Sequence, residues 1–235
     1  MPSFDPVVDA YDAARPSYPE GVHDALEPLA GARVVEGGAG TGIATRTLRE
    51  RGADVVALDI GEQMLRRVDG ERVVADAARA PLRDGCADLV CFAQVWHWLD
   101  HSIASAEMAR MLRRGGRWAG WWNHARADSE PWFEAYWDVL EARTGAYRWH
   151  RDTNWGATLD ADLFDPPSFL SVPWTREVPL DVWLTDQRSH SYIGLTAGGE
   201  AVMGALEQIL RDTFGDGPVR CRYETWLWQA RVRSA

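Results

Sequence analysis

The sequence predicts an α/β fold with a mostly parallel sheet, and three observations support this prediction. Short apolar segments alternate with segments of helical composition as far as Trp122, as expected for strands joined by crossover helices. The first apolar segment enters a glycine-rich turn, V-V-E-G-G-A-G-T-G over 34–42, and the second ends in the carboxylate of Asp59. Parallel strands with right-handed crossovers bring such turns to one edge of the sheet, where ligands bind.

The first half of the chain should contain five strands. After a short helix over 24–29, strand one begins at Arg33, and the glycine-rich turn leads into a helix over 43–51. Continuous apolar runs are typical of strands buried in parallel sheets. They predict the remaining strands over 54–59, 71–75, 87–93 and 117–122.

A helix should separate the last two of these strands. Apolar residues at helical spacing predict it over 103–114, with Gly115 and Gly116 at its end. The expected buried face consists of Ile103, Ala106, Ala109 and Leu112.

The second half departs from the alternation of strands and helices. Apolar spacing over 131–143, with proline at the first position, predicts an amphipathic helix. The polar segment 144–173 is ambiguous and lies about where a substrate lobe would be inserted between strands five and six. Strand six is expected over 174–180, and the long β-rich segment 219–230 suits an antiparallel strand at the sheet edge.

Composition argues against several classes of protein. The net charge of −10 over 235 residues disfavours a nucleic-acid groove, which needs a basic stripe to neutralise phosphates. Cys86, Cys91 and Cys221 show no C-x-x-C spacing and no histidine cluster accompanies them, so we expect neither a disulfide framework nor a metal site. Neither a signal-peptide core nor a run of roughly 18 apolar residues is visible. We therefore expect a cytoplasmic protein with no membrane partner, as a monomer or homodimer.

The spacing of the glycines narrows the type of nucleotide site. A dinucleotide-binding loop, G-x-G-x-x-G, needs its last glycine where Ile43 stands, and a phosphate-binding P-loop needs a lysine, which this chain lacks altogether. An NAD(P) oxidoreductase is therefore disfavoured. Glu36 would repel a phosphate but suits an ammonium group. Asp59, 21 residues after Gly38, could accept hydrogen bonds from both hydroxyls of a ribose.

These residues resemble the class I S-adenosylmethionine-dependent methyltransferases, in their small-molecule, type 11-like branch. The first motif of that family is an acidic residue followed by G-x-G-x-G at the end of strand one, as in E-G-G-A-G-T-G over 36–42. The resemblance implies S-adenosylmethionine as cofactor and a Rossmann-like, seven-stranded, mostly parallel sheet. It also implies helices on both faces, an antiparallel terminal strand and a small helical substrate lobe.

A single methyltransferase domain over 1–235 is then expected to have four parts. They are an N-terminal lid over 1–30, a cofactor-binding core over 31–122, an inserted substrate lobe over 123–173, and strands and helices that complete the sheet over 174–235.

The resemblance also implies which residues hold the cofactor. The segment Y-D-A-A-R-P-S-Y-P over 11–19 would lie over it, with Tyr11 and Arg15 near the methionine end. Asp76 would hydrogen-bond the adenine, although a helix-capping aspartate is the alternative at such a junction. The full expected set is Tyr11, Arg15, Glu36, Gly38, Gly40, Thr41, Gly42, Asp59, Ile60, Met64, Asp76, Ala77, Gln94 and Val95.

The segment Q-V-W-H-W-L-D over 94–100 follows strand four and should face the reactive methyl group. His97 titrates in the range needed to accept a proton from a substrate, although a histidine between tryptophans is often a packed or hydrogen-bonded residue. His124 and Tyr192 are the other candidate bases. Expected substrate contacts are Tyr18, Trp96, Trp98, His124 and Tyr192.

All 13 tryptophans lie at or after Trp96. Most should be core, but two or three in a pocket would suit an aromatic, planar or cationic acceptor. The predicted activity is in-line transfer of a methyl group to O, N or C of a small molecule, in a specialised natural-product pathway. The alternative is a non-catalytic sensor or partner subunit that binds S-adenosylmethionine or its product.

Overall fold

The computed structural model describes residues 14–126, 130–144, 156–190, 193 and 199–233. Seven strands form one sheet in the order β3-β2-β1-β4-β5-β7-β6. Neighbouring strands from β3 to β5 run parallel, whereas β7 is antiparallel to both β5 and β6. The strands are β1 (Arg33–Gly37), β2 (Asp54–Asp59), β3 (Arg72–Val74), β4 (Ala87–Ala93), β5 (Leu112–Ala125), β6 (Ser168–Val178) and β7 (Val219–Arg231).

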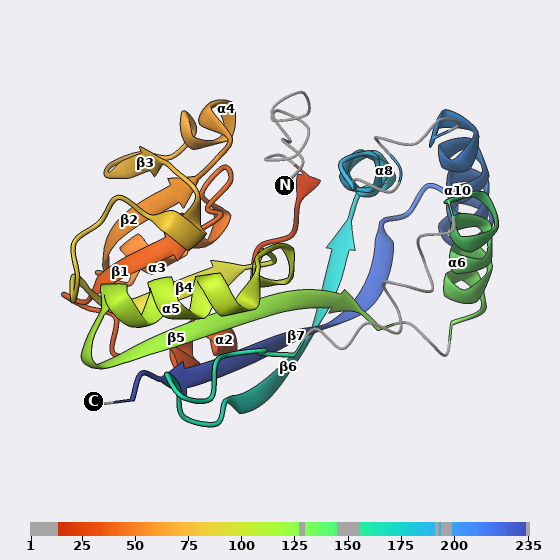
Figure 1. Ribbon diagram of the computed structural model, residues 1–235. Coiled ribbons are helices and arrows are strands. Elements are labelled where there is room, and N and C mark those ends of the chain that lie inside the picture. Colours follow the sequence, from red (N-terminus) through yellow and green to blue (C-terminus); the bar gives the residue numbers. More distant parts are fainter. Residues whose placement is uncertain (1–13, 127–129, 145–155, 191–192, 194–198, 234–235) are drawn as a thin grey trace.

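Helices cover both faces of this sheet, as Figure 1 shows for α5 on one side and α2 on the other. The named helices are α2 (Glu20–Ala25), α3 (Ile43–Glu50), α4 (Glu62–Leu65), η2 (Ala77–Arg79), η3 (Trp96–Trp98), α5 (His101–Met111), α6 (Pro131–Thr144), α8 (Leu180–Arg188) and α10 (Gly199–Phe214). The predicted mostly parallel, seven-stranded α/β sheet with helices on both faces and an antiparallel last strand is confirmed.

Two apolar layers hold the helices to the sheet. On one face, Val22 of α2 and Leu48 of α3 share a cluster with Val34 and Trp121. On the other face, α5 packs through Met108 against a cluster that includes β4 and β5. The successive side chains of each strand point to opposite faces, so the continuous apolar runs of β1 and β4 supply both layers.

The prediction for α5 was wrong in its bounds and in its buried face. The helix ends at Met111 rather than at residue 114, and Leu112 already begins β5. Asp100 caps the start, since its Oδ1 accepts from the backbone amides of Ser102 (3.0 Å) and Ile103 (3.2 Å). The buried positions are Ala104, Ser105, Met108 and Met111, whereas Ile103 is 44% exposed. One alanine, one serine and two methionines form this face, and apolar spacing does not mark a buried serine.

The position of β7 also differs from the prediction. It was expected at the sheet edge but lies between β5 and β6, so that β6 forms that edge. Strands β5 and β6 are longer than predicted, and the expected lobe boundaries at 123 and 173 fall inside them. Strand order is decided by long-range pairing, whereas the sequence pattern reports only that a segment is a strand.

A second core lies at the far end of β7, where α6 and α10 run side by side in Figure 1. Trp132 and Leu140 of α6 share this cluster with Trp183 of α8 and Leu206 of α10. The helical lobe is therefore formed by the chain before β6 together with the chain between β6 and β7. No helix among the described residues has the length and apolar character needed to cross a membrane.

Candidate functional site

The glycine-rich turn follows β1 at the carboxyl end of the sheet. Gly38, Gly40 and Gly42 have φ values of 69°, 56° and 82°, in the left-handed region that favours glycine. A Cβ at Gly38 would lie 2.6 Å from the methyl groups of Val95, so this position also lacks room for a side chain. Because α3 starts at Ile43, its first amides are left without intrahelical acceptors beside the turn.

Asp59 braces this turn from the end of β2. Its Oδ2 accepts from the Gly40 amide at 2.8 Å, and its Oδ1 accepts from the Gly61 amide at 2.7 Å. The sequence prediction placed Asp59 beside the loop, and the structure does bring the two together. The contact with a ribose stays a prediction, while the bracing role was not foreseen.

Glu36 lies beneath the turn rather than on its surface. It is 1% exposed, and its carboxyl accepts a hydrogen bond from the hydroxyl of Thr45 in α3. Burial is the main reason why the pKa of Glu36 rises to about 7. The predicted contact between Glu36 and an ammonium group is therefore not supported, because the side chain turns inward to α3.

The residues expected around the adenine converge on the same edge. The Cε atom of Met64, in α4, lies 3.6 Å from the position that a Cβ on Gly40 would occupy. The Cβ atom of Ala77 lies 3.0 Å from the position that a Cβ on Gly37 would occupy. The Oγ1 atom of Thr41 is buried and has no hydrogen-bond partner among the described residues.

Two other members of this set are more exposed. Ile60 is 42% exposed at the end of β2. The Oδ1 atom of Asp76 accepts from the Ala78 amide at 2.9 Å and so caps η2, which is the alternative role considered for it. The contacts of both residues with an adenine stay predictions.

The segment after β4 crosses to the glycine turn through an unusual backbone conformation. Gln94 has a φ of 65°, the one positive value for a non-glycine residue in the described part of the chain. Its amide donates to the Trp121 carbonyl at 2.9 Å, which ties the start of the segment to β5. Val95 then packs against Gly38. The two residues were both expected to bind the cofactor, and they do lie side by side.

His97 is held by two tryptophans. The Nε1–H of Trp122 donates to Nδ1 of His97 at 3.0 Å, and the ring centroid of Trp98 lies 5.0 Å from that of the imidazole. Trp98 is 38% exposed, so it can contact a ligand as predicted. The indole of Trp122 was not anticipated as a partner of His97.

Trp96 does not have the predicted role in substrate binding. It is completely buried, its Nε1–H donates to the Thr158 carbonyl at 3.3 Å, and its ring lies 4.9 Å from that of Trp118. A side chain with no accessible surface cannot contact a substrate, so Trp96 belongs to the core under α5.

The N-terminal segment is attached to the helical lobe. Arg15 Nε lies 3.5 Å from Oδ1 of Asp186 in α8, and Arg15 also donates to the Ser189 carbonyl at 3.4 Å. Asp186 is at the same time paired with the buried Arg176 of β6 at 2.5 Å. Arg15 is thus oriented toward α8.

The remaining predicted substrate residues are dispersed. Tyr18 packs edge-on against Trp121 with ring centroids 5.7 Å apart. The imidazole of His124 lies 4.1 Å from the ring of Trp226, and burial lowers its pKa to about 4, with a further contribution from Arg126. His124 is therefore neutral near pH 7 and a weak base. Tyr11 and Tyr192 lie outside the described residues.

Sequence reasoning missed Thr45, Trp122 and the Arg176–Asp186 pair. Trp122 is the last residue of the predicted strand five. Because adjacent parallel strands end at the same edge of the sheet, it could have been predicted to lie near the segment that follows strand four. The ion pair joins residues ten positions apart, but nothing in the sequence shows that both are buried.

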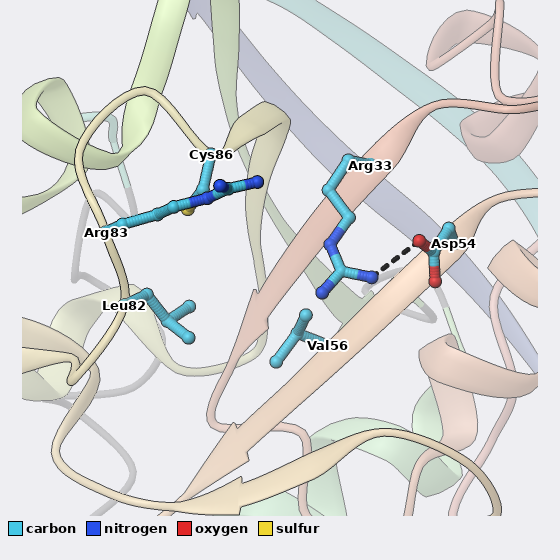
Figure 2. A pocket seen from close by; sticks show the side chains of 6 residues that line it. All are labelled: Arg33, Asp54, Val56, Leu82, Arg83 and Cys86. Carbon is cyan, nitrogen blue, oxygen red and sulfur yellow. Dashed lines mark hydrogen bonds and ion pairs between the residues drawn. The ribbon is translucent and has the colours of Figure 1, made fainter.

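A pocket of about 390 Å³ lies at the opposite end of the sheet. Figure 2 shows Arg33 and Asp54, the first residues of β1 and β2, among its lining side chains, together with Arg83 and Cys86. Since the glycine turn follows the carboxyl ends of these strands, this pocket is not the predicted cofactor site. Among the described residues, no group of three or more His, Cys, Asp or Glu side chains could hold a metal ion.

The sheet order, the three left-handed glycines and the acidic residue that braces the turn from the end of β2 define a Rossmann-like domain of the methyltransferase type. A sequence profile described as a methyltransferase domain matches residues 35–119. The chain is 47% identical to an uncharacterized methyltransferase of Mycobacterium tuberculosis over 126 residues, 52% of each protein. It is 32% identical to an uncharacterized methyltransferase-like protein of Schizosaccharomyces pombe over 189 residues, 76% of this chain and 66% of that one.

A solved structure from Anaeromyxobacter dehalogenans, assigned as a type II methyltransferase, has the same fold. It superposes with a TM-score of 0.62 at 22% identity and covers 92% of this chain and 97% of that one. Together these matches support a class I S-adenosylmethionine-dependent methyltransferase. Its alignment spans about half the length of the mycobacterial relatives that it matches.

Proposed function

We propose that this chain transfers a methyl group from S-adenosylmethionine to O, N or C of a small-molecule acceptor. The observation that carries the proposal is the geometry of the turn over 38–42. Three left-handed glycines leave the turn without side chains at these positions, and Asp59 holds the turn through the Gly40 amide. A loop without Cβ atoms lets a ligand approach the backbone closely.

The residues around the turn fit this cofactor. The Oγ1 atom of Thr41 is a buried group without a partner among the described residues, and buried hydroxyls are normally hydrogen-bonded. A carboxylate of the ligand could supply that partner. Asp59 stands beside the turn at the end of β2, and Met64 is an apolar neighbour for a purine.

When bound, S-adenosylmethionine would supply a methyl group already activated by a sulfonium sulfur. The protein then has to orient the acceptor and exclude water, because most of the barrier is reduced by positioning. Gln94 and Val95 lie next to the glycine turn and would line the sulfonium half of the cofactor. Trp98, 38% exposed beside His97, offers the acceptor an aromatic surface.

An aromatic or cationic acceptor from a specialised biosynthetic pathway is the finer form of this proposal. Its support is the partly exposed ring of Trp98, which suits stacking or cation–π attraction. The second candidate, a non-catalytic subunit that binds S-adenosylmethionine or its product, needs the same glycine turn. The two candidates therefore share the binding site and differ only in turnover.

Calorimetry is the first test. We expect S-adenosylmethionine to bind with micromolar affinity, and Gly38→Ala to abolish this binding because its Cβ would clash with Val95. Gly31→Ala is the matched control, since Gly31 also has a positive φ but has nothing within 4 Å of the added Cβ. The absence of binding by the unaltered chain would refute the proposal, as would tighter binding of a nicotinamide dinucleotide in a fluorescence titration.

A labelled-methyl transfer assay separates the two candidates. The chain is incubated with methyl-labelled S-adenosylmethionine and a mixture of small metabolites, and the label is followed into new products. Binding together with label transfer supports the enzyme. Binding with no transfer to any fraction would favour the non-catalytic subunit.

A further inference from the structure

The pocket at the amino ends of β1 and β2 takes no part in the proposed methyl transfer. The glycine turn lies between the end of β1 and the start of α3, at the opposite edge of the sheet. The pocket has a volume of about 390 Å³, and small-molecule sites measure roughly 300 to 1,000 Å³. Its lining residues are Arg33, Asp54, Val56, Leu82, Arg83 and Cys86 (Figure 2).

One wall of the pocket is the loop 80–86, which α5 holds in place. The Nη1 atom of Arg110 donates to the Leu82 carbonyl at 2.7 Å and to Oδ1 of Asp84 at 2.6 Å. The carbonyl of Arg110 accepts from the Gly85 amide at 2.9 Å. A single helical residue thus holds the loop at three points, so this wall is part of the folded scaffold.

The other wall is polar, and it stands beside apolar side chains. The guanidinium of Arg33 donates to Oδ2 of Asp54 at 2.5 Å and to Oε2 of Glu71 at 2.7 Å. Val56 lies two residues after Asp54 and so on the same face of β2, and it is 1% exposed. Leu82 packs against the cluster that contains Val56. The pocket therefore combines charged side chains with an apolar surface.

Arg83 supplies a positive charge to this pocket. Its side chain is exposed, and within the part of the chain that the structure describes its guanidinium has no hydrogen bond or ion pair. Figure 2 shows the side chain extending from its loop toward the side of the pocket where Arg33 lies. Since Arg33 is already paired with two carboxylates, the charge that remains to be paired is that of Arg83.

We propose that this pocket binds a small organic anion, whose carboxylate pairs with Arg83 beside Arg33 and whose apolar body lies on Val56 and Leu82. A planar guanidinium matches a carboxylate through two parallel N–H donors. Asp54 lines the same pocket and would repel a second negative charge, so the ligand carries one. The site does not depend on the proposed function, because it lies at the edge of the sheet opposite the glycine turn.

Cys86 reports on occupancy of the pocket. It is half-buried and lines the pocket, whereas Cys91 and Cys221, the other two cysteines of the sequence, are buried. Iodoacetamide is a neutral reagent: the sulfur displaces iodide, and the thiol proton passes to the solvent. Mass spectrometry can follow the rate of this reaction at Cys86.

Protection of Cys86 by benzoate tests the proposal. At constant ionic strength, benzoate at its dissociation constant, which we expect to be millimolar, should slow the alkylation about twofold, because half of the sites are then occupied. Benzamide has the same ring without the charge and should not slow it. No protection by benzoate, or equal protection by benzamide, would overturn the proposal.

A pair of charge-removing variants locates the anion. Arg83→Gln should abolish the protection. Arg79→Gln is the matched control, since it removes the same charge from an exposed arginine of η2 that does not line the pocket, and it should keep the protection. Because both side chains are exposed, both variants should unfold in urea with the parent's midpoint. Protection that persists in Arg83→Gln would overturn the proposal.

Two further measurements use the charge and the position of the site. Iodoacetate carries a carboxylate, so its rate at Cys86 relative to that of iodoacetamide should fall about threefold in Arg83→Gln, the effect of one unit charge about 6 Å away in water. An unchanged ratio would contradict the role of Arg83. Benzoate should also leave S-adenosylmethionine binding unchanged in calorimetry; competition between them would place the anion at the glycine turn and overturn the assignment.

Discussion

The replacement Glu36→Gln should make the protein more stable at alkaline pH and leave its stability nearly unchanged at acid pH. Glu36 is fully buried beneath the glycine-rich turn, and burial raises its pKa from 4.5 to about 7. A carboxyl group whose pKa is raised by folding stabilises the folded chain at low pH. This contribution is complete below about pH 4.5 and is lost as the pH rises through about 7.

The magnitude follows from that pKa. A rise from 4.5 to about 7 corresponds to about 3 kcal/mol in the free energy of unfolding. Glutamine keeps an oxygen that can accept the hydroxyl hydrogen bond of Thr45, but it has no charge to bury. The free energy of unfolding of Glu36→Gln should therefore exceed that of the parent by up to about 3 kcal/mol near pH 8, and by about zero near pH 4.

Urea unfolding followed by tryptophan fluorescence at the two pH values measures this difference. Thr45→Val should change stability at alkaline pH in the opposite direction to Glu36→Gln. The reason is that the Thr45 hydroxyl favours the ionised carboxylate of Glu36. It should lower stability by about 1 kcal/mol more at alkaline than at acid pH, and this pH dependence should disappear when Glu36→Gln is also present. If the difference in unfolding free energy between Glu36→Gln and the parent is the same at both pH values, the reasoning is refuted.

Three further substitutions test other parts of the structure. Asp59→Ala should weaken S-adenosylmethionine binding by at least about 1.5 kcal/mol, because charge-assisted hydrogen bonds to the loop and the ribose are lost; equal affinity in calorimetry would place the ribose elsewhere. Gly38→Ala should lower the free energy of unfolding by more than Gly31→Ala, since only the first adds a clash to the backbone strain; equal losses in urea would contradict the packing described. Asp186→Asn should cost about 3 to 5 kcal/mol by leaving the buried Arg176 without its charged partner, and a loss under about 1 kcal/mol would show that the pair is hydrated.

The cofactor half of the fold was predictable because its signals are local. Apolar runs bounded by glycine and carboxylate residues gave strands β2 and β4 with the observed bounds, and the start of α3 at Ile43 was correct. In these segments, backbone preferences and burial on both faces agree with each other. The left-handed conformations of Gly38 and Gly42 follow from the same local requirement.

Predictions failed where a residue's role depends on distant parts of the chain. Trp96 and Trp98 are two positions apart in one aromatic segment, yet one is fully buried and the other is 38% exposed. Glu36 was expected to face a ligand but bonds to Thr45. Composition and spacing do not reveal such differences, because each depends on which element packs over the side chain.

By itself, the sequence determined the class of fold, the place of the glycine turn and the acidic residue beside it. These features arise from the conformational freedom of glycine and from periodic burial, which act over a few residues. Only the tertiary structure decided that β7 lies inside the sheet, that Asp186 holds Arg15 and Arg176, and that the Trp122 indole donates to His97. Strand order, buried ion pairs and hydrogen bonds between strands join residues far apart in the chain, so their energies have no local pattern in the sequence.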